Sequence, residues 1–330
     1  MQLTSATTQT WPLAFVRGTL AAAAMGLLLT PAAVAQTWNE RPFNPAINSR
    51  WLIVGQADSE DFREAVHHDQ HISTRGELTF EDKLPGGFRI AYVMRDIAIT
   101  GTAPGTEMMN AALGALKGIT VRARTDASGL PVAVENLGEV RTAMHEVVER
   151  MVDNFKDKPK FPDLIREIMG RMVTADEAAA ARAFTDALPA LAAGQNTGLT
   201  PGEVRRKDDT VKSLLGGAPI KSVLTTRLVS WDNSAGTARI VRTRELDPDS
   251  IKAMTTAIAG KFAAAVGAPS SEKFMEIVKQ ISFTMDSETT IDVRDGMARA
   301  LKAHSAMTAR MMGHTFRKVE TKTVTVTELQ

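Results

Sequence analysis

The chain of 330 residues carries 39 Lys and Arg against 38 Asp and Glu and contains no cysteine. A near-neutral chain lacks the positive field that draws proteins onto nucleic acids or anionic membranes, so we expect no nucleic-acid partner. The absence of cysteine excludes disulfides, thiol catalysis and thiolate metal sites.

The N-terminus has the three regions of a secretory signal peptide. Arg17 is its single charged residue, an apolar run extends from Leu20 to Leu29, and Pro31 precedes the small-x-small triplet Ala33-Val34-Ala35. We therefore expect a signal peptide over residues 1–35, cleaved after Ala35, and a periplasmic or secreted mature protein with no stable membrane anchor. The apolar run is shorter than the roughly 20 residues that span a bilayer, which disfavours an uncleaved anchor helix.

Apolar runs that flank turn residues predict four β-hairpins. Each turn contains a residue that tolerates the positive φ of a tight reversal. The strands and turns are His71–Glu81 with Phe88–Ile99 through Pro85-Gly86-Gly87, Ile119–Thr125 with Leu130–Leu137 through 126–129, Ser222–Trp231 with Thr237–Leu246 through 232–236, and Ser282–Arg294 with Met297–Leu301 through Asp295-Gly296. A further strand is predicted at Thr315–Thr327, and Trp51–Val54 is either a short strand or a core anchor.

Amphipathic spacing predicts several helices. The best defined is Glu139–Val152, where Val140, Met144 and Val147 share one apolar stripe. Further helices are predicted over Phe161–Met172, over Thr174–Leu188, after the N-cap Asp247, and after Ser270 or Ser271. The basic triplet Arg205-Arg206-Lys207 is followed at once by Asp208-Asp209, which predicts a solvated turn.

Hairpins and helices alternate twice along the chain, which predicts an N-terminal half over residues 36–193 and a C-terminal half over residues 203–330. A flexible link, Gly194–Gly202, joins them, and one continuous domain remains an alternative. We expect the α+β class. Its antiparallel β-sheet, open or curved into a half-barrel, is built from repeated hairpins, with amphipathic helices on one face.

One cluster has the residue types of a metal site. On a strand, His67, Asp69 and His71 project from the same face, and imidazole with carboxylate suits zinc or a similar divalent ion. The alternative interpretation is the polar, solvent-facing side of a strand, because no fourth ligand is identifiable.

Other chemical motifs are incomplete. His145 and Glu149 stand at the spacing of a zinc-protease helix, but the second histidine is replaced by glutamate. Ser270 and Lys273 match Ser-x-x-Lys without its partner motifs, and Met311-Met312-Gly313-His314 is a weak thioether copper candidate. We therefore expect no catalytic residue and no cofactor, which favours a protein that is not an enzyme.

Two stretches support a resemblance to a group of uncharacterised exported bacterial proteins built from hairpins and helices. These are Gly86-Gly87-Phe88-Arg89-Ile90 and Asp126-Ala127-Ser128-Gly129-Leu130-Pro131-Val132. The order of elements also resembles the periplasmic lipoprotein carriers, in which an antiparallel half-barrel with helices encloses an apolar cavity. The resemblance transfers no ligand-contacting residue, and fold analogy alone does not establish function.

Three functions stay open at this stage. The first is a carrier that holds an apolar small molecule between sheet and helices. The second is a structural or partner-binding envelope protein that offers an exposed apolar patch or an unpaired sheet edge such as the C-terminal strand. The third is a metal-dependent hydrolase that uses His67, Asp69 and His71.

Overall fold

The computed structural model describes most of the chain after the expected signal peptide. The described residues are 38–63, 66–103, 106–114, 116–153, 166, 188–211, 219–254, 256, 282–311 and 314–330. The predicted signal peptide, all of the predicted helix Phe161–Met172 except Arg166, most of the predicted helix Thr174–Leu188 and the helix predicted after Ser270 or Ser271 lie outside these ranges.

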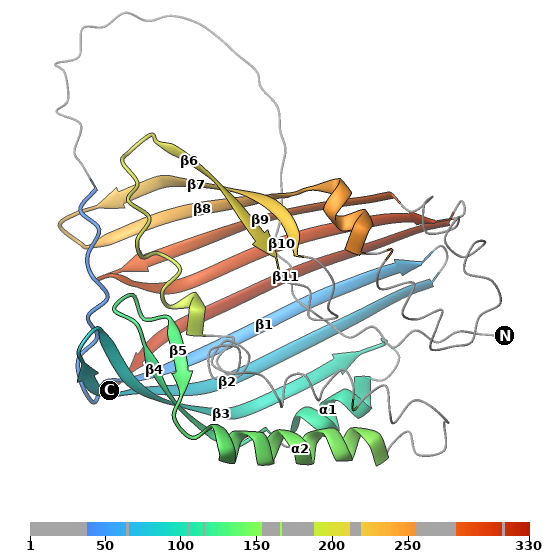
Figure 1. The fold of residues 1–330 in the computed structure, drawn as a ribbon, viewed down its shortest axis with the longest axis horizontal. Coiled ribbons are helices and arrows are strands. Elements are labelled where there is room, and N and C mark those ends of the chain that lie inside the picture. The colour runs from blue at the N-terminus through green and yellow to red at the C-terminus, as the bar shows by residue number, and fades with distance from the viewer. Residues whose placement is uncertain are drawn as a thin grey trace, which may run out of the picture.

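One antiparallel sheet of eleven strands dominates the described residues, in the order β5-β4-β3-β2-β1-β11-β10-β9-β8-β7-β6. Figure 1 shows the first strand (blue) lying beside the last (red), with β5 and β6 toward opposite edges. The strands are β1 Arg50–Arg63, β2 Val66–Leu84, β3 Gly87–Gly101, β4 Thr120–Thr125, β5 Pro131–Val134, β6 Val204–Val211, β7 Ile220–Asp232, β8 Thr237–Leu246, β9 Ser282–Arg294, β10 Met297–Met311 and β11 His314–Leu329.

All four predicted hairpins are confirmed, as the pairs β2–β3, β4–β5, β7–β8 and β9–β10. Two of their turns show the local chemistry that made them predictable. Asp126 Oδ1 accepts hydrogen bonds from the backbone N–H of Ser128 at 2.9 Å and of Leu130 at 3.0 Å. Asp232 does the same for Ser234 and Ala235, and these bonds, led by the Ser234 hydroxyl, lower the pKa of its carboxyl. The two Asp-x-Ser turns therefore close β4–β5 and β7–β8 by the same Asx geometry.

The predicted helix at Glu139–Val152 is confirmed as α2, Leu137–Asp153. Its buried Val140 and Met144 pack on Val121 and Val134 of β4 and β5. Helix α1, Thr106–Gly114, lies near α2 and beside β3, as Figure 1 shows. None of the helices in the described parts of the chain combines the length and apolarity needed to cross a membrane.

The expected α+β class is wrong: strands make up most of the described chain, and α1 and α2 stand against the β3–β5 end of the sheet instead of covering one face. The physical reason is strand length. β1 and β10 extend well past the predicted Trp51–Val54 and Met297–Leu301, through segments in which polar and small residues predominate on both faces despite Phe62 and Met307. Such segments lack the alternation that marks a half-buried strand.

Two local expectations are also corrected. Arg205-Arg206-Lys207 and the aspartates after it form edge strand β6, paired with β7, instead of a solvated turn. The C-terminal strand β11 is no sheet edge, because it pairs with β1 on one side and β10 on the other. Its position joins the two predicted halves into one sheet.

The hydrophobic core lies on one face of the sheet, called the inner face below. Trp51 and Ile53 of β1 point to it, and so do their cross-strand partners Leu78 of β2 and Val326 of β11, all less than 8% exposed. The short 3-10 turn Leu188–Ala190 and its neighbour Leu191 pack onto this cluster.

The segment Gly194–Gly202, expected as a flexible link, is held in place by hydrogen bonds to charged side chains. Glu40 Oε2 accepts from the N–H and hydroxyl of Thr197, at 3.1 and 2.8 Å. Arg205 Nη1 donates to the Thr197 carbonyl at 2.7 Å. Leu199, held within the segment, packs into a second core cluster with Trp38 and Ile240.

We predict that Gly87→Ala destabilises the fold, because a Cβ at this position would collide with the backbone carbonyl of Thr125 on β4. The free energy of unfolding should fall by about 1–3 kcal/mol in urea titrations followed by circular dichroism. Gly114→Ala is the control, since open space surrounds that position, and its stability should be unchanged or higher. Equal effects of the two substitutions would contradict the packing described here.

We also predict a pH-dependent contribution from Glu203. The hydroxyl and N–H of Thr200 and the guanidinium of Arg205 lower the pKa of Glu203 from 4.5 to about 2. A carboxyl with a lowered pKa stabilises the fold above its unfolded value, and this stabilisation fades as pH falls toward about 2. Glu203→Gln should therefore lower the urea midpoint at pH 7 and leave it unchanged near pH 2, whereas Glu245→Gln should change little at either pH.

Candidate functional site

The predicted metal ligands His67, Asp69 and His71 lie on β2 and point to the outer face of the sheet. Their cross-strand partners on β1 are Phe62, Glu60 and Asp58. The alternation predicted for a strand is therefore correct, and the His67 and His71 side chains are 53% and 41% exposed.

Each of the three side chains contacts a different neighbour. His71 Nδ1 lies 2.6 Å from Asp58 Oδ1, and the His67 ring stacks on Phe62 with centroids 4.6 Å apart. Asp69 accepts a hydrogen bond from the Thr102 hydroxyl at 2.5 Å, and this bond lowers the pKa of Asp69. Within the described ranges, no three His, Asp or Glu side chains come together as a metal site. A metal at His67, Asp69 and His71 thus stays a prediction from sequence alone.

The other sequence candidates give no site. Glu149 on α2 receives two hydrogen bonds from Arg166, at 3.1 and 2.9 Å, which lower its pKa. Ser270, Lys273 and Met312 lie outside the described residues.

The inner face changes character abruptly along the strands. Ile240, Ile291, Leu301 and Val324 form one cross-strand row over β8, β9, β10 and β11. Directly paired residues share a face, so this row is a continuous apolar band.

Two residues further along each strand, the inward side chains become small or charged. The next row is Arg242, Thr289, Ala303, Lys322 and Ala57, and the row beyond it includes Ser305, Glu320 and Ser59. These small side chains are buried: Ser59, Thr289 and Ala57 are 9%, 5% and 7% exposed. A sheet that buries small polar side chains beside a band of large apolar ones presents an amphipathic surface.

Two arginines of β8 stand at the β6–β7 side of this surface. The Arg244 side chain is 13% exposed and forms an ion pair with Asp209 of β6. Burial, followed by the positive charge of Arg244, lowers the pKa of Arg242. In the described part of the chain, the buried Nε atoms of both arginines and the buried Oγ of Ser222 have no hydrogen-bond partner.

These arginines were not singled out from the sequence, although a signal was present. Ile240, Arg242 and Arg244 alternate with Val241 and Thr243 in a predicted strand. A period of two therefore places one apolar and two cationic residues on the same face, where β-strand alternation usually buries apolar residues.

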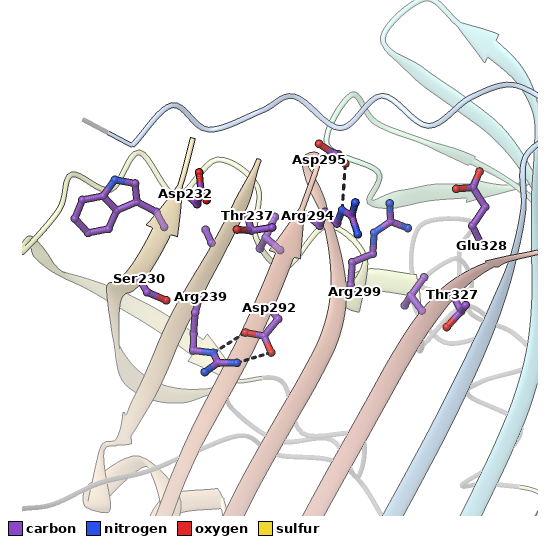
Figure 2. Close-up of a pocket in the computed structure, with 14 residues that line it drawn as sticks. Ser230, Asp232, Thr237, Arg239, Asp292, Arg294, Asp295, Arg299, Thr327 and Glu328 are labelled. Carbon is purple, nitrogen blue, oxygen red and sulfur yellow. Dashed lines mark hydrogen bonds and ion pairs between the residues drawn. The ribbon is translucent and has the colours of Figure 1, made fainter. Parts of the chain in front are cut away.

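A pocket of about 890 Å³ opens at the hairpin end of the sheet, where β10 pairs with β11 only from Ala300 onward. Figure 2 shows the ion pair of Arg239 with Asp292, whose oxygens lie 2.6 and 3.1 Å from the guanidinium. Arg299 stacks over the Trp51 ring at 4.2 Å, and burial lowers its pKa.

The charges around this pocket largely compensate one another. The lining contains three cations and four acids. The cations are Arg239, Arg294 and Arg299, and the acids are Asp232, Asp292, Asp295 and Glu328. The inner face, with its unpartnered guanidinium atoms, is therefore the stronger candidate for a ligand site.

No protein-family model matches the chain, and no curated protein sequence matches it. Three solved structures are similar at low scores. DynF from the dynemicin biosynthesis pathway of Micromonospora chersina has 6% identity and a TM-score of 0.18, with 90% of this chain and 92% of DynF covered. An outer membrane channel of Pseudomonas putida F1 has 8% identity and a TM-score of 0.17, with 91% and 100% covered. The attachment invasion locus protein Ail of Yersinia pestis has 5% identity and a TM-score of 0.12, with 86% and 100% covered. TM-scores this low carry no argument about this chain.

We predict that Asp209→Asn destabilises the protein, because it leaves the largely buried guanidinium of Arg244 without its carboxylate. Since Asp209 is itself about one-third exposed, the free energy of unfolding should fall by about 1–2 kcal/mol. Asp208→Asn, the adjacent exposed position on the other face of β6, is the matched control and should leave the urea midpoint unchanged. A larger effect at Asp208 would show that the inner-face pair is not a stabilising contact.

Proposed function

We propose that this protein is an exported, ligand-binding protein of the cell envelope that holds an apolar small molecule against the inner face of its sheet. The observation that carries the proposal is the row of small side chains beside the apolar band. Ala57, Ala303 and Thr289, unlike Lys322 between the two alanines, are too short to fill the layer that Ile240, Ile291 and Val324 occupy two residues away. Protein interiors are close-packed, so a layer of this kind favours an additional occupant.

Apolar side chains continue the same row beyond β1. Ala57 pairs with Ile72 of β2, and Ile72 pairs with Ile99 of β3, which is 3% exposed. From Arg242 on β8 to Ala57 on β1 the row crosses four inter-strand spacings, roughly 19 Å. A surface of this length suits an extended hydrocarbon chain, with isoleucines at one end and guanidinium groups at the other.

The proposed export rests on the segmented N-terminus. Arg17, the apolar run before Pro31 and the triplet Ala33-Val34-Ala35 have the order and composition of a cleavable leader. An envelope location also suits a chain without cysteine, which needs no defined redox state.

The binding proposal is tested with the neutral fluorophore N-phenyl-1-naphthylamine, whose emission rises when it leaves water. We expect saturable binding, weakened at least about tenfold by Ala303→Leu, because a larger side chain would occupy the ligand's layer. Ala306→Leu is the matched control: it lies on the same strand and points to the outer face, so binding should be unchanged.

Absence of saturable binding in the wild-type protein would overturn the proposal and favour the structural or partner-binding alternative. The same conclusion would follow if both leucine variants weakened binding equally, since the inner face would then have no special role. Circular dichroism of each variant establishes that the sheet is retained.

A further inference from the structure

Two arginines of β8 point to the inner face close together, although only one of them has an acidic partner in the described part of the chain. Arg242 and Arg244 are two residues apart on one strand, so both project from the same face, about 7 Å apart along β8. Arg244 Nη2 is paired with Asp209, whereas Arg242 forms no ion pair within the described residues.

This arrangement of two like charges is electrostatically unfavourable. Burial disfavours the charged form of Arg242, and the neighbouring Arg244 adds like-charge repulsion. Glu40, on the arm before β1, is the acid that offsets part of this repulsion. A buried guanidinium nitrogen without an acceptor also loses the hydrogen bond that water would supply.

A third unpartnered group lies on the adjacent strand. Ser222 of β7 is 4% exposed, and its buried Oγ has no hydrogen-bond partner in the described chain. Ser222, Leu224 and Thr226 alternate inward on β7, opposite Leu246, Arg244 and Arg242 of β8. Two donor nitrogens and one hydroxyl are therefore presented by one strand pair, with an apolar leucine among them.

An anion is the group that would accept hydrogen bonds from the two guanidinium Nε atoms, whereas Ser222, opposite Leu246 of β8 and Asp209 of β6, lies at the edge of this patch. Guanidinium nitrogens bind carboxylate and phosphate oxygens in charge-assisted hydrogen bonds, which are about twice as strong as neutral ones. One side of this patch is apolar: Ile240 is the preceding inward residue of β8, and Leu228 pairs with it from β7, whereas the direct partners of Arg242 are Thr226 and Thr289. A free inorganic anion has no apolar part that could contact Ile240 and Leu228.

We infer that Arg242 and Arg244, with Ser222 at the edge of the patch, form the head-group site for an anionic amphiphile whose hydrocarbon chain lies along Thr289 and Ala303, past the inward Lys322, toward Ala57. This inference rests on the proposed function and names its substrate class. A fatty carboxylate and an alkyl phosphate share the required chemistry, a single anionic head on a hydrocarbon chain.

The experiment measures displacement of N-phenyl-1-naphthylamine from the full chain by dodecanoate, dodecyl phosphate and dodecanol, which share one chain length. In the wild-type protein, at least one of the two anions should compete about tenfold better than dodecanol. The better anion identifies the head group as carboxylate or phosphate. Equal competition by all three would overturn the inference and leave the proposed function standing, whereas no binding of probe or competitor would remove both.

Arg242→Gln is the diagnostic variant, because Arg242 has no ion pair in the described residues whose loss would disturb the sheet. It should reduce the affinity for the preferred anion about tenfold and leave dodecanol unchanged. Arg227→Gln is the matched control: Arg227 lies on β7, is exposed, and faces away from the site, so the anion preference should persist. A preserved preference in Arg242→Gln would overturn the inference, and the wild-type comparison decides the question if that variant does not fold.

Discussion

The architecture depends on the pairing of β1 with β11. Fourteen residues of β1 pair with β11, from Arg50 opposite Leu329 to Arg63 opposite Phe316. Loop-closure entropy rises only logarithmically with the length of chain enclosed, so a long ladder of backbone hydrogen bonds can offset the cost of joining distant segments. Without this pairing the chain would form two smaller sheets, each with an additional open edge.

The same pairing assembles the inner face. It places Ala57 beside Lys322, which extends the row that begins at Arg242 into the N-terminal half of the sheet, and Ser59 beside Glu320, which extends the next row. The large apolar residues of the two halves are joined in the same way, because Ile53 of β1 meets Val326 of β11, next to the row that ends at Val324. The amphipathic surface is thus a property of the completed sheet and belongs to neither half alone.

Short-range chemistry made the hairpins predictable. Asp126 and Asp232 form turns with contacts to residues only a few positions away, Asp295 and Gly296 adopt the positive φ of a tight turn, and helix α2 follows from the spacing of Val140, Met144 and Val147. Strand neighbours that are distant in sequence could not be inferred in this way. Nothing in the composition of Thr315–Thr327 indicates that this strand lies at the centre of the sheet instead of at its edge.

The candidate site was missed for a related reason. Charged residues in a strand ordinarily point toward solvent, so the sequence predicts a turn at Arg205–Asp209 and assigns no role to Arg242 and Arg244. Their inward direction follows only from register with Thr226 and Leu224, which are themselves set by the β7–β8 turn. The histidines, by contrast, were correctly expected to share one face of a strand, but the metal role drawn from that face remains untested.

The order in which the strands are made has a consequence of its own. β1 is the first strand of the sheet to be synthesised, and β11 is made after all the others. Throughout that interval one side of β1 offers a row of unpaired backbone groups, a template for pairing with other chains. A growing chain, or one that has lost β11 to proteolysis, would expose the same edge, so protection of β1 during biogenesis is a requirement that this topology imposes.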